Sequence, residues 1–180
     1  MPELPVAEMF TGMGVMTSVG MMVTISQREK LLGRAVREDE LEPLDWQTLQ
    51  KARTYTAEQM FLARGSDTGG RILDQFLNQY DLILTPTTAA PSPLLGKLSL
   101  NQPYESFMGE AMKSSPYTAL FNMSGQPAMS VPMHWTADNV PVGAHLRPAL
   151  AVKVACCAWL PSEQTVPWAG RMPDLSVFKA

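Results

Sequence analysis

Charged side chains are scarce in this sequence. Of its 180 residues 17% are charged, with 14 lysines and arginines against 17 aspartates and glutamates, and the formal net charge is −3. The lysines and arginines form no basic stripe, whereas nucleic-acid binding requires clustered cations to neutralise phosphates. The hydrophobic fraction, 46%, is typical of a chain that folds around a core. The composition therefore predicts one folded domain with no nucleic-acid partner, and it leaves a homo-oligomer open.

Cysteine is nearly absent. Its two copies, Cys156 and Cys157, are adjacent within an apolar run, so they cannot form a disulfide framework. This usage favours a reducing, cytoplasmic setting. A Cys157 nucleophile paired with His145 is an alternative, but thiols buried in apolar surroundings are inert.

Histidine is equally rare, and the only two, His134 and His145, rule out a multi-histidine metal site. Methionine is abundant instead, and Met9, Met13 and Met16 fall at helical spacing. Thioether ligands usually select Cu(I), but no cysteine or histidine accompanies these three residues. We interpret them as flexible core filler and expect no metal and no cofactor.

One uncharged stretch near the N-terminus resembles a membrane span by length. Residues 6–25 carry a single charge, on Glu8, but glycine, threonine and serine dilute their hydrophobicity below that of a leucine-rich span. The sequence also starts without the positively charged region of a secretory signal. We therefore expect no membrane association and a cytoplasmic location.

The first half of the sequence has helical periodicity. Residues 6–32 predict one helix, which Gly33 ends in a left-handed conformation. Pro43 fits the start of the next helix, with Asp45 as its N-cap, and the period continues to residue 60. The glycine-rich run at residues 65–70 lacks the spacing of a phosphate-binding loop. It therefore predicts a loop between helices, and the helical period resumes after it.

The second half changes character. The apolar run at residues 82–84 is typical of a buried strand, and the proline- and serine-rich residues 85–103 predict an irregular excursion. Residues 117–122 suit a short helix that ends before Gly125. Residues 128–132 and 141–145 predict two strands of a hairpin.

Two segments carry a resemblance to a known family. Residues 80–87, Tyr-Asp-Leu-Ile-Leu-Thr-Pro-Thr, and residues 121–132, Phe-Asn-Met-Ser-Gly-Gln-Pro-Ala-Met-Ser-Val-Pro, closely resemble the C-terminal portion of the amidase signature family. Residues 141–143, Pro-Val-Gly, lie where that family has Gly-Leu-Pro-Val-Gly, with Asn139 and Val140 as departures. Within the family, the chain is most similar to 6-aminohexanoate cyclic-dimer hydrolases and related bacterial amidases.

This resemblance implies a fold and a chemistry. The fold is α/β: residues 1–180 form a single partial amidase domain, with helices packed on a partial mixed sheet. The family hydrolyses carboxylic amides with a Ser-Ser-Lys core, in which lysine acts as base through the middle serine and the nucleophile follows a Gly-Gly-Ser-Ser-Gly-Gly-Ser segment. The sequence contains no such segment, so we expect no catalytic residue in it. A small-molecule amide, linear or cyclic, is then a partner only when the N-terminal half is present, and the alternative is an inactive remnant or a scaffold.

Few residues remain as site candidates. Residues 113–115, Lys-Ser-Ser, have the residue types of the family's core, but they are contiguous and lack flanking glycines, whereas a catalytic triad converges from distant segments. Asn122, Ser124 and Gln126 are weak candidates for substrate binding. The favoured interpretation is that these three satisfy backbone groups in a buried turn.

The resemblance breaks after His145 and resumes at Glu163. With suitable codons for residues 147–162, reading from one nucleotide earlier yields Ala-Arg-Phe-Gly-Gly-Glu-Gly-Cys-Leu-Leu-Arg-Leu-Ala-Ala-Gln, which is the segment that the family has there. We therefore hypothesise that residues 146–162 are frameshifted relative to the family, either in the gene or in its sequencing. The shift replaces an amphipathic helix, and we expect an extended or irregular segment in its place.

Overall fold

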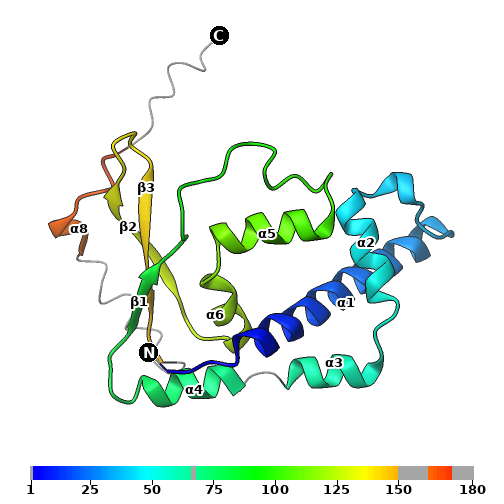
Figure 1. Cartoon of the computed structure of the whole chain (residues 1–180), viewed down its shortest axis with the longest axis horizontal. Coiled ribbons are helices and arrows are strands. Elements are labelled where there is room, and N and C mark those ends of the chain that lie inside the picture. The colour runs from blue at the N-terminus through cyan, green and yellow to red at the C-terminus, as the bar shows by residue number, and fades with distance from the viewer. Residues whose placement is uncertain (1, 66–67, 150–161, 172–180) are drawn as a thin grey trace, which may run out of the picture.

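The computed structural model describes residues 2–65, 68–149 and 162–171, and its helices lie beside a small sheet (Figure 1). The elements of the first half are α1 (Val6–Leu32), the 3-10 turn η1 (Glu38–Glu40), α2 (Pro43–Ala52), α3 (Ala57–Arg64) and α4 (Thr68–Phe76). Those of the second half are β1 (Ile83–Pro86), α5 (Tyr104–Ser114), α6 (Thr118–Ser124), β2 (Met129–Trp135), β3 (Pro141–Arg147) and α8 (Ser162–Thr165). This arrangement agrees with the expected α/β class. Most of the hypothesised frameshifted segment, including Cys156 and Cys157, lies outside the described residues.

The helix predicted at residues 6–32 is confirmed as α1, together with its end. Gly33 has a φ of +67°, and its amide donates to the carbonyl of Glu29, as in a left-handed C-cap. Between Glu8 and Arg28 the helix carries no charge, so it has no polar face. By length and composition, α1 is the one helix of the described residues that could cross a membrane, a test that core helices of soluble proteins also pass.

The following helices depart from the expected boundaries. Asp45 is not an N-cap, because α2 begins at Pro43 and Asp45 therefore lies in its first turn. Proline suits the first position of a helix, because its missing N–H would have no partner within the helix there. Helix α3 is capped by Thr56, whose hydroxyl accepts from the Gln59 amide while the Gln59 side chain accepts from the Thr56 amide. The loop expected through residue 70 is too long, because α4 already begins at Thr68.

The sheet has three strands in the order β1-β3-β2, and both pairings are antiparallel. The hairpin predicted from residues 128–132 and 141–145 is confirmed, with Val131 opposite Ala144. The expected mixed sheet is not seen among the described strands. The expected buried strand is also only half right, since Ile83 is 8% exposed but Leu84 is 62% exposed.

Helix α5 was not expected from the sequence. It covers Tyr104–Ser114, directly after the irregular excursion, a range for which no element was predicted. The short helix α6 is close to its expected range, and Gly125 ends it with a φ of +68°. In Figure 1, α6 lies between the sheet and the start of α1, and α5 extends from α6 toward α2.

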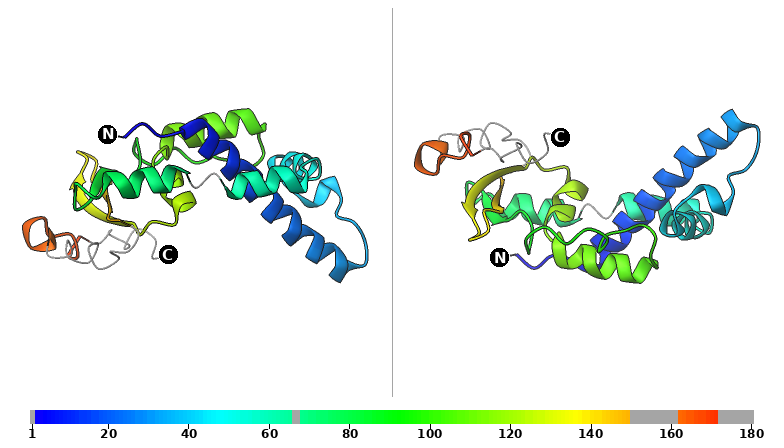
Figure 2. Two further views of the ribbon diagram at one scale, coloured as in Figure 1. Left: turned by 90° about the horizontal axis from the view of Figure 1, so that it is seen from below. Right: turned by 90° about the horizontal axis from the view of Figure 1, so that it is seen from above.

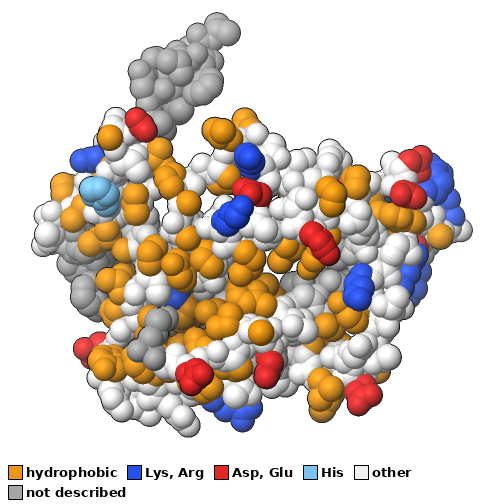
Figure 3. Space-filling view, viewed as in Figure 1, with side chains coloured by type: hydrophobic (Ala, Val, Ile, Leu, Met, Phe, Trp, Pro, Cys, Tyr) orange, Lys and Arg blue, Asp and Glu red, His pale blue; other side chains and the backbone are white. Residues whose placement is uncertain are grey.

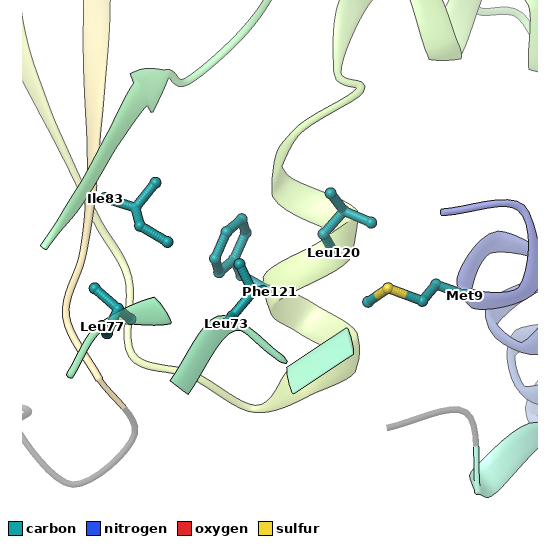
Figure 4. Close-up of a cluster of buried hydrophobic side chains, with 6 residues drawn as sticks. All are labelled: Met9, Leu73, Leu77, Ile83, Leu120 and Phe121. Carbon is teal, nitrogen blue, oxygen red and sulfur yellow. The ribbon is translucent and has the colours of Figure 1, made fainter. Parts of the chain in front are cut away.

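A cluster of buried side chains joins these elements (Figure 4). It comprises Met9 from α1, Leu73 and Leu77 from α4 and the turn after it, Ile83 from β1, and Leu120 and Phe121 from α6. Residues far apart in the sequence thus share one small core, and α6 occupies its centre between α1 and the sheet.

Candidate functional site

The candidate residues of the α6–β2 junction have three different environments. Asn122 is exposed, Ser124 is half-buried, and Gln126 is 6% exposed. The Ser124 hydroxyl lies 3.3 Å from both the Phe121 carbonyl and Oε1 of Gln126. The three side chains therefore do not converge on a common point.

Gln126 links this junction to α4. Its Nε2 donates to Oδ1 of Asp74 at 2.7 Å, across 52 positions of sequence. A buried amide that donates to a carboxylate is satisfied and positions the chain. This contact supports the interpretation that Gln126 holds the turn, with Ser124 contributing to the same network.

The segments that carry the family resemblance meet at the sheet. The amide of Thr87 donates to the carbonyl of Gly143 at 2.9 Å, and the hydroxyl oxygens of Thr87 and Ser130 lie 2.5 Å apart. A Cβ at Gly143 would overlap both hydroxyls, so only glycine fits between them. Each of the three positions belongs to one of the quoted motifs, so motifs that are far apart in the sequence meet at one place in the sheet.

His145 and Arg147 lie inside the molecule near the end of β3, with exposed fractions of 7% and 1%. Nε of Arg147 donates to Nδ1 of His145 at 2.9 Å, and its guanidinium carbon lies 3.5 Å from the centre of the Phe121 ring. Burial and the neighbouring Arg147 lower the pKa of His145 to about 4, and burial lowers the pKa of Arg147 to about 10. His145 is therefore neutral near pH 7, which supports a structural role rather than that of a base.

The remaining candidates are also not arranged for catalysis. Lys113 is exposed and pairs with Glu110 at 3.0 Å, while the carbonyl of Ser114 accepts from the amide of Ala89. His134 is exposed on β2. In the described ranges, no three or more His, Cys, Asp or Glu side chains gather in a way that could hold a metal ion.

Sequence reasoning did not find two polar residues of this region, the half-buried Asp74 and the buried Arg147. Asp74 lies in a helix that is otherwise amphipathic, and nothing local marks it as the partner of Gln126. Arg147 lies at the start of the segment where the resemblance fails. A long cationic residue there would not be assigned to a core by its type.

The fold and these motifs define a part of an amide-hydrolase domain. The chain belongs to the Amidase family, whose sequence model matches residues 11–147. It is 27% identical over 165 residues to the 6-aminohexanoate-cyclic-dimer hydrolase of Paenarthrobacter ureafaciens, a match covering 84% of this chain and 32% of that protein. It is 28% identical over 144 residues to the lipoamidase of Enterococcus faecalis, a match covering 68% of this chain and 20% of that protein.

Solved structures agree on the fold. A structure of 6-aminohexanoate cyclic dimer hydrolase aligns with a TM-score of 0.77 and 23% identity, covering 96% of this chain and 37% of that one. A bacterial aryl acylamidase of the amidase signature family aligns with a TM-score of 0.66 and 18% identity, covering 93% of this chain and 37% of that one. The chain therefore spans about a third of the length of these relatives.

Proposed function

We propose that this chain is the C-terminal portion of an enzyme that hydrolyses carboxylic amides, and that the Ser-Ser-Lys core lies in a segment N-terminal to it. The observation that carries the proposal is the family match over residues 11–147 in a chain that contains no Gly-Gly-Ser-Ser-Gly-Gly-Ser segment. A catalytic core in a separate N-terminal segment would explain both the missing catalytic groups and the partial coverage of the relatives.

The substrate class follows from the relatives. Their names describe the hydrolysis of a cyclic 6-aminohexanoate dimer, of lipoamides and of acylamides. These substrates share a carboxylic amide, linear or cyclic. In this chain residues 121–132 would contribute at most a wall of the substrate pocket, and Asn122 is the one exposed member among the three weak candidates. A cytoplasmic setting is part of this proposal.

The alternative is an inactive remnant, and Arg147 favours it. The hypothesised frameshift begins next to this residue, and Arg147 places a cationic group in a core position of β3. If Arg147 is encoded by a CGN codon, the alternative reading frame has a codon ending in CG at this position, which encodes Ser, Pro, Thr or Ala. A small side chain fits such a position without burying a charge. A decayed gene would keep the signature motifs of the fold while single residues, such as Arg147, cease to match their buried surroundings.

Fusion to a catalytic half tests the proposed function. The full chain is joined behind the portion of the Paenarthrobacter ureafaciens hydrolase that precedes its match, and hydrolysis of the 6-aminohexanoate cyclic dimer and of aryl amides is measured. We expect the fusion to release amine from at least one of these substrates and the chain alone to release none. A fusion without activity, alongside an active parent hydrolase, would contradict the proposal in favour of the remnant.

A further inference from the structure

We propose that the cavity between α1, α2 and α3 binds an ω-amino carboxylate, a flexible molecule with an ammonium group at one end and a carboxylate at the other. The inference deepens the proposed function and rests on it. Hydrolysis of a cyclic amide adds water across one C–N bond, so the acyl carbon becomes a carboxylate and the nitrogen becomes an ammonium group on the same chain. The proposed ligand is therefore a product of that reaction.

The wall of this cavity is largely apolar. Its volume is about 810 Å³, within the usual range for small-molecule sites. Val15 and Ala63 are buried in the wall, whereas Phe61 and Leu62 beside them are 78% and 64% exposed. In both views of Figure 2, α2 and α3 lie on the same side of α1, and Figure 3 shows apolar side chains at the surface over α3. Such a wall suits the methylene chain of a small ligand.

Two opposite charges line the same cavity, Glu8 from the first turn of α1 and Lys51 from the last turn of α2. Within the described parts of the chain, neither of them forms a salt bridge. The ammonium group of Lys51 lies 5.8 Å from the centre of the Tyr55 ring, which also lines the cavity. Glu8 can therefore pair with the ammonium group of a ligand, and Lys51 with its carboxylate.

Two uncharged polar side chains of the wall already have partners. The Thr11 hydroxyl donates to the Ala7 carbonyl at 2.8 Å, and Oε1 of Gln59 accepts from the Thr56 amide at 2.8 Å. Recognition of a polar ligand therefore depends chiefly on the two charges.

The separation of the two charges sets the length of the ligand. Lys51 and Tyr55 also line an adjoining cavity of about 340 Å³ together with Gly14 and Ser18. These positions lie roughly 9–15 Å along the axis of α1 from Glu8, at the usual rise per residue. After about 3 Å for the contact at each end, an extended chain of about three to seven bonds spans the remainder. The molecule 6-aminohexanoate has a chain of this length.

NMR titration of the purified 180-residue chain tests the site. We expect 6-aminohexanoate to bind with a Kd of about 1 mM. Hexanoate and hexylamine each lack one of the two charges and should bind about fivefold more weakly. Glycine has both charges but is too short to reach both residues, so it should bind more weakly still. Equal affinities of hexanoate, hexylamine and 6-aminohexanoate would overturn the proposal, because the cavity would then take any apolar chain.

Charge substitutions connect the affinity to the two residues. Glu8→Gln should weaken the binding of 6-aminohexanoate about fivefold and leave that of hexanoate unchanged, because hexanoate has no ammonium group. Lys51→Gln should likewise weaken 6-aminohexanoate and leave hexylamine unchanged. Glu58→Gln removes an exposed carboxylate of α3 outside the cavity, and as the matched control it should change none of these affinities. An equal loss of both ligands in Glu8→Gln would overturn the proposal.

An exchange of the two charges guards against variants that lose affinity by distorting the cavity. Glu8→Lys and Lys51→Glu should each abolish the preference for 6-aminohexanoate over its singly charged analogues. The double variant should restore the preference, because the ligand can bind in the reversed direction. A double variant that folds, as its melting temperature reports, but shows no preference would contradict recognition by these two charges.

The outcomes separate this site from the proposed function. No binding to the chain alone would overturn the site, and an active fusion would then leave the proposed function standing. Binding with the expected charge dependence beside an inactive fusion would support the site alone. Binding that depends on Glu8 in the chain but disappears in the fusion would mean that the preceding segment fills the cavity, and it would overturn the proposal.

Discussion

Arg147 donates a hydrogen bond of 2.9 Å from Nε to Nδ1 of His145, and the two side chains are both buried on β3. The bond requires Nδ1 to be an acceptor, so the imidazole must be neutral at that nitrogen. The guanidinium plane also faces Phe121 at the centre of the core cluster. The pair therefore couples the end of the sheet to α6 and makes the protein sensitive to acid.

The first prediction is a loss of stability on acidification. The pKa of His145 is about 4 in the folded chain and about 6.5 in an unfolded one. Because the unfolded chain binds the proton more readily, the stabilisation is complete above pH 6.5 and is lost as the pH falls towards 4. The loss is at most about 3 kcal/mol. Urea unfolding at pH 7 and at pH 4.5 measures it.

The two histidines provide the control for this prediction. His145→Gln should flatten the pH dependence of the free energy of unfolding between pH 7 and 4.5. His134→Gln should leave it as in the parent, because His134 is exposed. An unchanged pH dependence in His145→Gln would show that another group carries the acid sensitivity.

The second prediction concerns the buried charge of Arg147. No carboxylate lies within ion-pair distance of it in the part of the chain that the structure describes. An apolar side chain of similar length avoids the desolvation cost, so Arg147→Met should leave the stability unchanged or raise it by about 1–2 kcal/mol. Arg147→Ala removes the contact with Phe121 and should be less stable than Arg147→Met. A large loss in Arg147→Met would mean that the guanidinium is an integral part of the fold.

The third prediction tests the frameshift. Resequencing the gene should either correct the reading frame between the codons of residues 146 and 162, which places the shift in the sequencing, or confirm both shifts, which places them in the gene. A protein built with the segment read in the alternative frame should melt at a higher temperature, because that frame encodes an amphipathic helix that covers core. A confirmed sequence together with a restored-frame protein that melts lower would refute the hypothesis.

The fourth prediction concerns a close approach between α1 and α4. A Cβ at Gly69 would overlap the sulfur of Met9, so Gly69→Ala should destabilise the protein by about 1–3 kcal/mol despite the better helix propensity of alanine. In a Met9→Ala background the same change should cost little, because the overlapping atoms are gone. Gly14→Ala on α1 is the control, since a Cβ there meets nothing within 4 Å. Additive effects of the two substitutions would rule out the contact.

The fifth prediction separates a structural role from a binding role at the α6–β2 junction. Gln126→Ala removes the bond to Asp74 and should lower the free energy of unfolding by about 1–2 kcal/mol. Asn122→Ala should leave it within about 0.5 kcal/mol, because its side chain is exposed. Equal stability of the two variants would remove the structural interpretation of Gln126.

Local signals in the sequence account for the parts of the fold that were predicted well. A helix end at Gly33, a helix end at Gly125 and the hairpin of β2 and β3 depend on neighbouring residues and on alternation over a few positions. The start of α2 at Pro43 was predicted correctly, but the N-cap was assigned to Asp45, which lies inside the first turn because the helix already begins two residues earlier.

The rest depends on contacts that the sequence does not display. Gln126 and Asp74 are 52 positions apart, and the exposure of Leu84 depends on which elements cover β1. Helix α5 was not predicted, and none of its residues is buried. For the site, the residue types pointed to a family, but only the fold places Thr87, Ser130 and Gly143 together.

The most direct test of the account is amide hydrolysis by the purified 180-residue chain alone. The account predicts no product above the buffer control with the 6-aminohexanoate cyclic dimer or with aryl amides, because the proposed function places the serine nucleophile and its lysine outside this sequence. Hydrolysis that persists through purification and is abolished by Ser114→Ala, Ser115→Ala or Lys113→Ala would contradict it, since the catalytic groups would then be within this chain.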